Sequence, residues 1–133
     1  MAAVSGVRDL DELIRSMRPV RAPGEFVFVS LDTPLADLPA AATVGEPEGV
    51  TYVVERHEAD ARSLPYDFVA AWITLHVRSA LDAVGLTAAV STALAGAGIS
   101  CNVLAGRFHD HLLVPLGRSD EAVAVLERLA GER

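Results

Sequence analysis

The residues most able to do chemistry lie in a short segment near position 110. His109, Asp110 and His111 follow one another, and His76 ends an earlier apolar stretch. If the later segment is a strand, His109 and His111 share a face, where two imidazoles can bind zinc. Antiparallel pairing with the strand that ends at His76 would bring a third imidazole to that face. Asp110 would point the other way, so structural or solvent-facing histidines are favoured over a metal site.

Cys101 is the only cysteine, which excludes an intrachain disulfide. A nucleophilic cysteine needs a nearby cation or a helix N-terminus beneath it, and neither is evident, so a small buried thiol is expected. All eleven basic residues are arginine, which excludes Schiff-base chemistry and the phosphate-binding lysine of a P-loop. No Gly-x-Ser-x-Gly spacing occurs. The sequence therefore predicts no catalytic residue, metal or cofactor, and argues against an enzyme.

Composition indicates a folded, acidic chain of 133 residues with 51% hydrophobic residues. This length corresponds to one ordinary domain or two very small ones. A formal net charge of -7 repels phosphate backbones, so nucleic acid is an unexpected partner. The first ten residues lack an apolar signal-peptide core, and the hydrophobic stretch at 84–97 is too short to span a bilayer. We expect a soluble, cytoplasmic protein with no membrane association.

The second half of the chain has the clearer periodicity. Residues 70–77 alternate as a half-buried strand, and residues 86–97 carry one apolar helical face that ends at Gly98. Two further strands and a helix follow, at 100–105, at 109–115 and from Ser119, which we expect to cap that helix. The order strand, helix, strand, strand, helix is a ferredoxin-like unit without its last strand.

The first half is less regular. Asp9 is expected to cap a helix whose apolar stripe runs from Leu10 to Met17. Residues 25–31 form an apolar strand, residues 33–39 are irregular, a hairpin occupies 42–55, and a short helix covers 56–62. Because residues 25–31 are apolar on both faces, we consider them a donor for the strand that the second half lacks.

A specific resemblance appears between Trp72 and Pro115. A strand at 73–77 is followed by Ala83-Val84-Gly85-Leu86, a helix of small residues, and a Gly98-Ile99-Ser100 turn into the next strand. This segment resembles short bacterial tandem ACT-domain proteins of unknown function, which are related to the regulatory domains of aspartokinases. The resemblance implies an α+β fold, a ferredoxin-like duplication whose antiparallel or mixed sheets are covered by helices on one face. It divides the chain into halves at 1–65 and 66–133. Val84 departs from the family, where proline often precedes the loop glycine.

The expected topology places the loop at 78–85 and the start of the following helix at one end of the sheet. Free backbone N–H groups and the helix dipole favour a carboxylate there. The strand at 100–105 is an edge and can pair with its equivalent in a neighbouring half or subunit, which would bring residues 100–102 to this end. ACT domains bind amino acids between the first loop and a second strand, and the resemblance therefore implies a ligand site. Its candidate residues are Asp82, Val84, Gly85, Leu86, Cys101 and Asn102.

We therefore expect a regulatory protein that senses a small molecule, with an amino acid as ligand, and that forms a homodimer. Trp72 lies on the sheet face opposite the apolar one, where it would pack against another half or subunit. The alternative is a structural or protein-interaction module of the same fold with an empty pocket.

Overall fold

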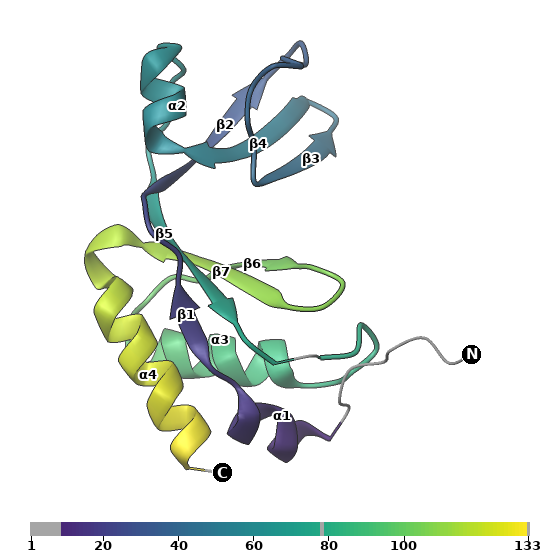
Figure 1. Ribbon diagram of the computed structural model, residues 1–133, viewed down its shortest axis with the longest axis vertical. Helices are drawn as coiled ribbons and strands as arrows, with labels where there is room; N and C mark the ends of the chain where they lie inside the picture. Colours follow the sequence, from purple (N-terminus) through teal and green to yellow (C-terminus); the bar gives the residue numbers. More distant parts are fainter. Residues whose placement is uncertain (1–8, 78, 133) are drawn as a thin grey trace. The chain divides into compact units, whose positions relative to one another are not determined.

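The computed structural model describes residues 9–77 and 79–132, and these fold as two compact units (Figure 1). Residues 23–70 form one unit, which we call the inserted unit. Residues 1–22 and 71–133 form the other, which we call the split unit because two separated segments of the chain build it.

The inserted unit is an antiparallel sheet with one short helix. Its sheet order is β3-β4-β2-β5, and β5 contributes its first two residues, Val69 and Ala70. The elements are β2 (Phe26–Leu31), β3 (Ala42–Glu46), β4 (Gly49–Glu55), α2 (Arg56–Ala61) and the start of β5 (Val69–Leu75).

A loop replaces the first helix of this unit. Residues 32–41 contain neither helix nor strand, which confirms the irregular segment predicted there. Leu38 from the loop is nevertheless buried beside Val27 and Val54 of the sheet. The phenol oxygen of buried Tyr52 accepts a hydrogen bond from the Leu35 N–H at 2.9 Å. Leu35 also packs against this core, and the Ala41 N–H donates to Val53 O of β4 at 2.8 Å, so apolar contacts and hydrogen bonds to the sheet fix the loop.

Among its described residues, the split unit has a four-stranded sheet in the order β1-β5-β7-β6 and three helices. The pairings of β1 with β5 and of β6 with β7 are antiparallel. Its elements are α1 (Leu10–Ser16), β1 (Pro19–Arg21), β5, α3 (Leu86–Gly96), β6 (Asn102–Ala105), β7 (Asp110–Pro115), a 3₁₀ turn (Leu116–Arg118) and α4 (Ser119–Gly131).

The strand that completes this sheet is β1, and the proposed donor at 25–31 was wrong. Pro19, Val20 and Arg21 pair with Leu75, Thr74 and Ile73. Residues 26–31 pair instead with β4 along their whole length. A three-residue strand carries too little alternation to be recognised in a sequence, and Pro19 reads first as a helix terminator.

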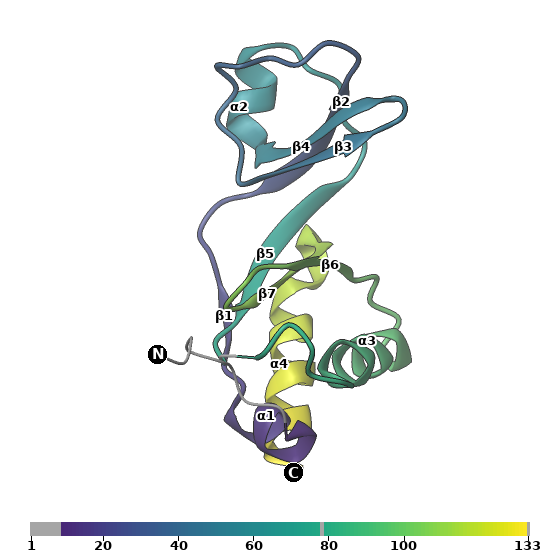
Figure 2. The ribbon, with the colours of Figure 1, turned by 90° about the vertical axis from the view of Figure 1, so that its right-hand side faces the viewer.

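The core of the split unit lies between one face of its sheet and its three helices (Figure 2). Ile73 and Leu75 of β5 are buried there with Leu112 and Val114 of β7. The helices contribute Leu13 and Ile14 from α1, Val90 and Leu94 from α3, and Val125 and Leu126 from α4. The predicted stripe of α1 is therefore a core element of a unit whose other helices come from the far end of the sequence.

Of the two predicted helix caps, the structure confirms Asp9 and corrects Ser119. Asp9 Oδ1 accepts a hydrogen bond from the Glu12 N–H at 2.9 Å, as a capping residue should. Ser119 is the first residue of α4 and is buried, while Arg118 occupies the capping position. The guanidinium of Arg118 instead donates to Ala97 O at 2.9 Å, at the C-terminus of α3, where a cation is favoured. The preceding 3₁₀ turn moves the cap by one residue.

The fold class is the expected one, an α+β duplication of ferredoxin-like units with antiparallel sheets. The division at 1–65 and 66–133 stays a prediction about the two repeats, because the compact units divide the chain at 22 and 70.

Candidate functional site

The first loop of the split unit turns into α3 at Gly85. This residue has φ +106°, in the left-handed region that glycine adopts without strain. A Cβ atom here would lie 2.9 Å from Cδ2 of Leu10, so α1 covers the loop closely. The first intrahelical hydrogen bond of α3 runs from Ala89 N to Gly85 O at 2.9 Å. The earlier N–H groups of the first turn have no partner within the helix and lie at its positive end.

These N–H groups lie beside a small, partly enclosed cavity of about 160 Å³. Three segments line it: the loop at 79–83, the start of α3 from Gly85 to Thr87, and the β6–β7 turn at 105–110. Pockets for drug-sized ligands measure about 300–1,000 Å³, so this cavity fits only a small molecule. We call it the loop pocket.

Asp110 and His109 are the titratable residues among those that line the loop pocket. Burial raises the pKa of the Asp110 carboxyl, and the neighbouring His111 and His109 lower it in part. His109 is held by a 3.2 Å hydrogen bond from its Nδ1–H to Val77 O, at the end of β5. A carboxylate thus lies on one wall of the pocket and the positive end of a helix on another. This is the polarity that a zwitterion requires.

The structure places the predicted residues in two groups. Gly85 and Leu86 line the loop pocket. Asp82 and Val84 lie in the same loop but are exposed, Val84 by 82%. Cys101 and Asn102 lie at the start of β6, whose other end, at Ala105, lines the pocket. Within one chain these two residues are therefore not part of the loop pocket, and their role in a site stays a prediction.

Burial raises the pKa of the Cys101 thiol, as expected for a thiol without nucleophilic function. Asn102 Nδ2 lies 3.5 Å from Leu113 O on the neighbouring strand. β6 is the last strand on its side of the sheet, as predicted. Its outer backbone groups are therefore available to pair with another strand.

Sequence reasoning missed the pocket residues of the β6–β7 turn. Gly106, His109 and Asp110 line the cavity, and the Gly106 N–H donates to His109 O at 2.9 Å to close the turn. The signal that could have found them is topological. In a ferredoxin-like unit the turn between the second and third strands lies at the same end of the sheet as the first loop.

The open face of the split unit's sheet carries a cluster of histidines, which we call the histidine face. The rings of His76 and His109 stack with centroids 5.4 Å apart. His111 lies beside Trp72, with ring centroids 5.0 Å apart, and its Nδ1 lies 2.9 Å from Thr74 Oγ1. Trp72 thus has ring and hydrogen-bond partners on its own sheet face, beyond the packing against another half or subunit that was predicted for it.

The three-histidine metal site, which the sequence analysis weighed and disfavoured, has no support in this geometry. In the part of the chain that the structure describes, no three His, Cys, Asp or Glu side chains are arranged to hold a metal ion. The stacked rings of His76 and His109 lie face to face, and His111 Nδ1 is engaged by a hydroxyl. Two nitrogens from stacked rings do not converge on one point as tetrahedral coordination requires.

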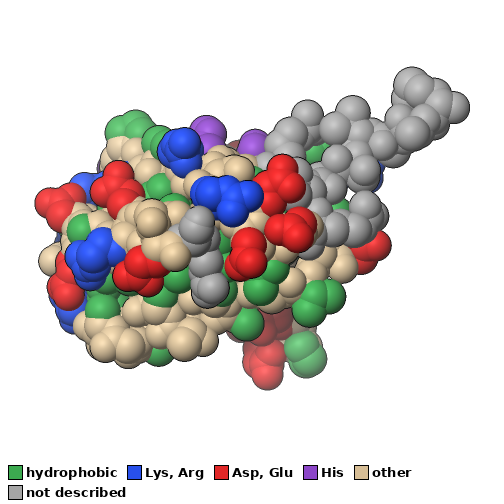
Figure 3. Space-filling model, turned by 90° about the horizontal axis from the view of Figure 1, so that it is seen from below, with side chains coloured by type: hydrophobic (Ala, Val, Ile, Leu, Met, Phe, Trp, Pro, Cys, Tyr) green, Lys and Arg blue, Asp and Glu red, His purple; other side chains and the backbone are tan. Residues whose placement is uncertain are grey.

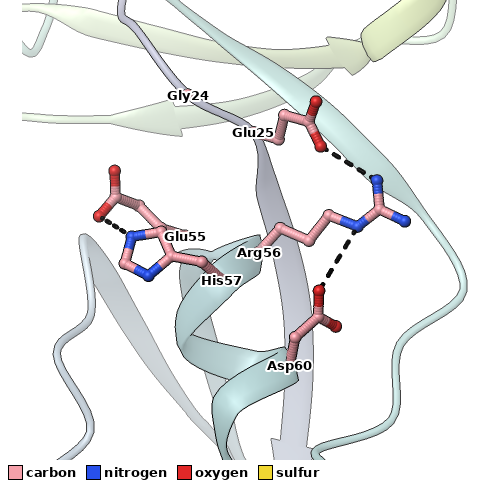
Figure 4. A pocket seen from close by; sticks show the side chains of 6 residues that line it. All are labelled: Gly24, Glu25, Glu55, Arg56, His57 and Asp60. Atoms are coloured by element: carbon pink, nitrogen blue, oxygen red, sulfur yellow. Dashed lines mark hydrogen bonds and ion pairs between the residues drawn. The ribbon is translucent and has the colours of Figure 1, made fainter.

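A second pocket, of about 400 Å³, lies in the inserted unit. The guanidinium of Arg56 lies between two carboxylates, 3.0 Å from Glu25 Oε1 and 3.9 Å from Asp60 Oδ2 (Figure 4). Glu55 points away from this arginine, toward His57 at 3.0 Å. The charges of this pocket are thus paired with one another.

The outer surface of the split unit shows carboxylates and arginines interspersed where α1 and the end of α4 face the viewer (Figure 3). The net charge of -7 is thus not gathered into one acidic patch on this face. No helix among residues 9–77 and 79–132 has both the length and the apolar character needed to span a membrane.

Both units have the ferredoxin-like α+β architecture, in which helical structure packs against an antiparallel sheet. The chain belongs to the ACT domain family, because ACT-domain models match residues 5–71 and residues 68–128. The two matches cover both repeats, including the less regular first one.

Solved structures share this architecture. A Vibrio cholerae protein of unknown function, named a possible transport protein, has a TM-score of 0.84 and 41% identity, over 91% of this chain and 95% of that chain. An Agrobacterium tumefaciens protein has a TM-score of 0.69 and 16% identity, over 86% and 89%. The regulatory subunit of aspartate kinase from Thermus flavus has a TM-score of 0.63 and 10% identity, over 84% and 96%. The last two share the fold alone, and no curated protein matches the sequence.

Proposed function

We propose that this protein is a regulatory module that senses an amino acid at the loop pocket of its split unit. ACT domains are regulatory modules, and the chain contains two of them. The observation that carries the proposal is the pairing, across one small cavity, of the N-terminus of α3 with the half-buried Asp110.

The two polar walls suit the two ends of an α-amino acid. Backbone N–H groups of the first turn of α3 receive the carboxylate, and the helix dipole favours its charge. The Asp110 carboxylate receives the ammonium group, and a nearby cation would offset the desolvation that raises the pKa of Asp110. A volume of about 160 Å³ restricts the ligand to a small one.

A neighbouring subunit supplies the remaining wall in this proposal. The outer edge of β6 pairs with its equivalent in a second copy, so that the partner's strand start, at Cys101 and Asn102, approaches the loop at Asp82 and Val84. Exposed apolar side chains near the loop pocket support such an association, since large exposed hydrophobic side chains mark interaction sites when they gather. They are Leu81 at 70%, Val84 at 82% and Phe108 at 44% exposure.

The proposal includes a cytoplasmic location and no catalytic activity of its own. A half-buried Cys101 whose pKa is raised by desolvation is a poor nucleophile. In this proposal the bound amino acid controls the activity of a partner protein through this module.

A thermal-shift screen of the full chain against each of the twenty common amino acids tests the proposal. Saturation at about one hundred times the Kd stabilises the native state by about 2.7 kcal/mol, which is a readily measured shift. The shift should disappear in Asp110→Asn, which loses the ammonium partner. It should persist in Asp120→Asn, a control in the exposed first turn of α4.

Amino-acid sensing is contradicted if none of the twenty shifts the midpoint of a well-folded protein. Light scattering of the same samples then tests the second subunit. The dimer should weaken when Val84 and Phe108 are both replaced by serine, and a monomer at all concentrations would remove the shared wall from the proposal.

The exposed hydrophobic side chains of Leu81, Val84 and Phe108 also favour a second candidate, an interaction module without a ligand. If this second candidate is correct, the protein forms the dimer and no amino acid shifts its unfolding midpoint. The same two measurements therefore separate the two functions.

A further inference from the structure

The walls of the loop pocket consist mainly of small residues. Three alanines line it, Ala80 and Ala83 from the first loop and Ala105 from the end of β6. Gly85 and Gly106 contribute only their backbone. Liquid water occupies about 30 Å³ per molecule, so a cavity of about 160 Å³ has room for about five to seven non-hydrogen atoms. This is the size of glycine, alanine or serine.

Hydrogen bonds fix the two loops that form these walls. In the first loop the Ala83 N–H donates to Ala80 O at 3.0 Å and closes a turn. In the β6–β7 turn the Gly106 N–H donates to His109 O at 2.9 Å. The ring Nδ1–H of His109 donates to Val77 O at 3.2 Å, which ties this turn to the end of β5. A ligand too large for the cavity would therefore have to break hydrogen bonds in order to enter.

The helical side of the pocket is supported from behind by α1. A Cβ atom at Gly85 would lie 2.9 Å from Leu10 Cδ2, so there is no free space between α1 and the start of α3. Leu13 and Ile14 hold α1 in the core, where Leu86 of α3 is also buried. The start of α3 cannot move away from the pocket without disturbing these buried contacts. The size of the cavity is therefore set by the packing of the split unit.

The charge of the pocket restricts the ligand further. In the proposed site the ammonium group of an amino acid already occupies Asp110. A second carboxylate on the ligand, as in aspartate, would lie close to Asp110 within a small cavity, where like charges repel strongly. Among the described residues that line the pocket there is no arginine to offset this repulsion, and the chain has no lysine.

We infer that the loop pocket selects small neutral α-amino acids, no larger than serine, and that Ala105 limits their size. The inference rests on the proposed function, because it names the ligand class of the same site. Ala105 is the lining alanine best suited to substitution, since it is exposed and ends a strand, where a β-branched residue is tolerated. Valine at this position should narrow the pocket at little cost to the fold.

Calorimetric titration of the full chain with a series of linear α-amino acids tests the size limit. Glycine, alanine, α-aminobutyrate, norvaline and norleucine differ by one methylene at each step, and α-aminobutyrate is nearly isosteric with serine. We expect similar Kd values for the first three. The Kd should then rise about tenfold or more at norvaline and again at norleucine, as for a methylene that a pocket cannot accept.

Aspartate and asparagine, which are nearly isosteric, test the charge. Both exceed the size limit, so each is measured as a competitor against bound alanine. Asparagine should bind about tenfold or more tightly than aspartate, because only aspartate brings an unpaired charge to the pocket.

The variant Ala105→Val tests the residue that limits the size. It should raise the Kd for alanine and serine about tenfold or more relative to the Kd for glycine, which has no side chain to clash with valine. A general structural defect would instead weaken all three ligands equally. Ala40→Val makes the same change at an exposed position of the inserted unit and should leave every Kd within about twofold of the original protein.

The inference is overturned if norvaline, leucine or lysine binds as tightly as alanine, or if aspartate binds better than asparagine. It is also overturned if Ala105→Val weakens glycine and serine by the same factor. All of these results leave amino-acid sensing itself standing. Absence of binding by every amino acid is a different result, which removes the proposed function and this inference together.

Discussion

The two units of this chain descend from one topology and differ most at the first connection after the first strand. In the split unit this connection ends at left-handed Gly85 and an eleven-residue helix, α3. In the inserted unit it is a loop at 32–41, closed by Leu38 and the Tyr52 hydroxyl. Only a helix of several turns presents a row of unbonded N–H groups with an aligned dipole. At this connection the same sheet topology thus carries a helix N-terminus in one repeat and a loop in the other.

The pockets of the two units also differ, in how far their charged groups are paired. In the inserted unit Arg56 is held by Glu25, Asp60 and the Tyr66 hydroxyl, so its charge is satisfied. In the split unit Asp110 remains half-buried, with a raised pKa. A group that retains a desolvation penalty is a candidate for binding, whereas a group in a complete network is more often structural. Four substitutions, each with a matched control, test how the two units differ.

The largest effect is expected from Ile14→Ala, which tests whether α1 is a core element of the split unit. Ile14 is fully buried beside side chains of α3 and α4. Truncation of such a residue should lower the free energy of unfolding by about 2–5 kcal/mol in urea denaturation. Arg15→Ala, on the exposed side of α1, should change it by less than about 0.5 kcal/mol. Equal effects of the two variants would show that α1 contributes no core.

A smaller loss is expected from Gly85→Ala, at the start of α3. Its φ of +106° is unfavourable for alanine, and the new Cβ would lie 2.9 Å from Leu10 Cδ2. The combined strain should lower the free energy of unfolding by about 1–3 kcal/mol. Gly96→Ala, near the end of the same helix and with open space around its Cβ, should be neutral or stabilising by up to about 1 kcal/mol. The prediction is contradicted if both substitutions change the free energy of unfolding in the same direction.

Tyr52→Phe tests the loop that replaces a helix in the inserted unit. It removes the acceptor of the Leu35 N–H, and we expect a loss of about 1–2 kcal/mol in urea denaturation. Tyr66→Phe removes a more exposed hydroxyl, 2.9 Å from Arg56 Nε, and should have a smaller effect. If Tyr66→Phe is the more damaging, the charged network and not the loop stabilises this unit.

The smallest effect on stability is expected from Asp110→Asn, and it should be stabilising. Because burial raises the pKa of Asp110, the charged form weakens folding above the ordinary aspartate pKa of about 3.9. The amide should therefore raise the unfolding midpoint at about pH 7, and the gain should shrink as the pH approaches 4. Asp120→Asn should instead lower it slightly, since Asp120 lies in the first turn of α4. A destabilising Asp110→Asn would place that carboxylate in a structural network.

Much of the fold was present in local patterns of the sequence. The alternation of 70–77, the helical face of 86–97 and the irregular segment near 33–39 each depend on neighbouring residues, and all three were found. The caps show the limit of such patterns. Asp9 was identified correctly, whereas Ser119 was displaced by a 3₁₀ turn whose geometry depends on the packing around Arg118.

The sequence by itself determined the kind and position of most elements, the tight loop at Gly85, and the absence of lysine and of an intrachain disulfide. Tertiary structure alone decided that β1 completes the distant sheet and that α1 shares its core. It also decided that Asp110 and His109 line one cavity together with Gly85. Periodicity records which side of an element is buried, because burial constrains residues a few positions apart. It does not record which partner buries that side, since strand pairing joins residues that are remote in the chain.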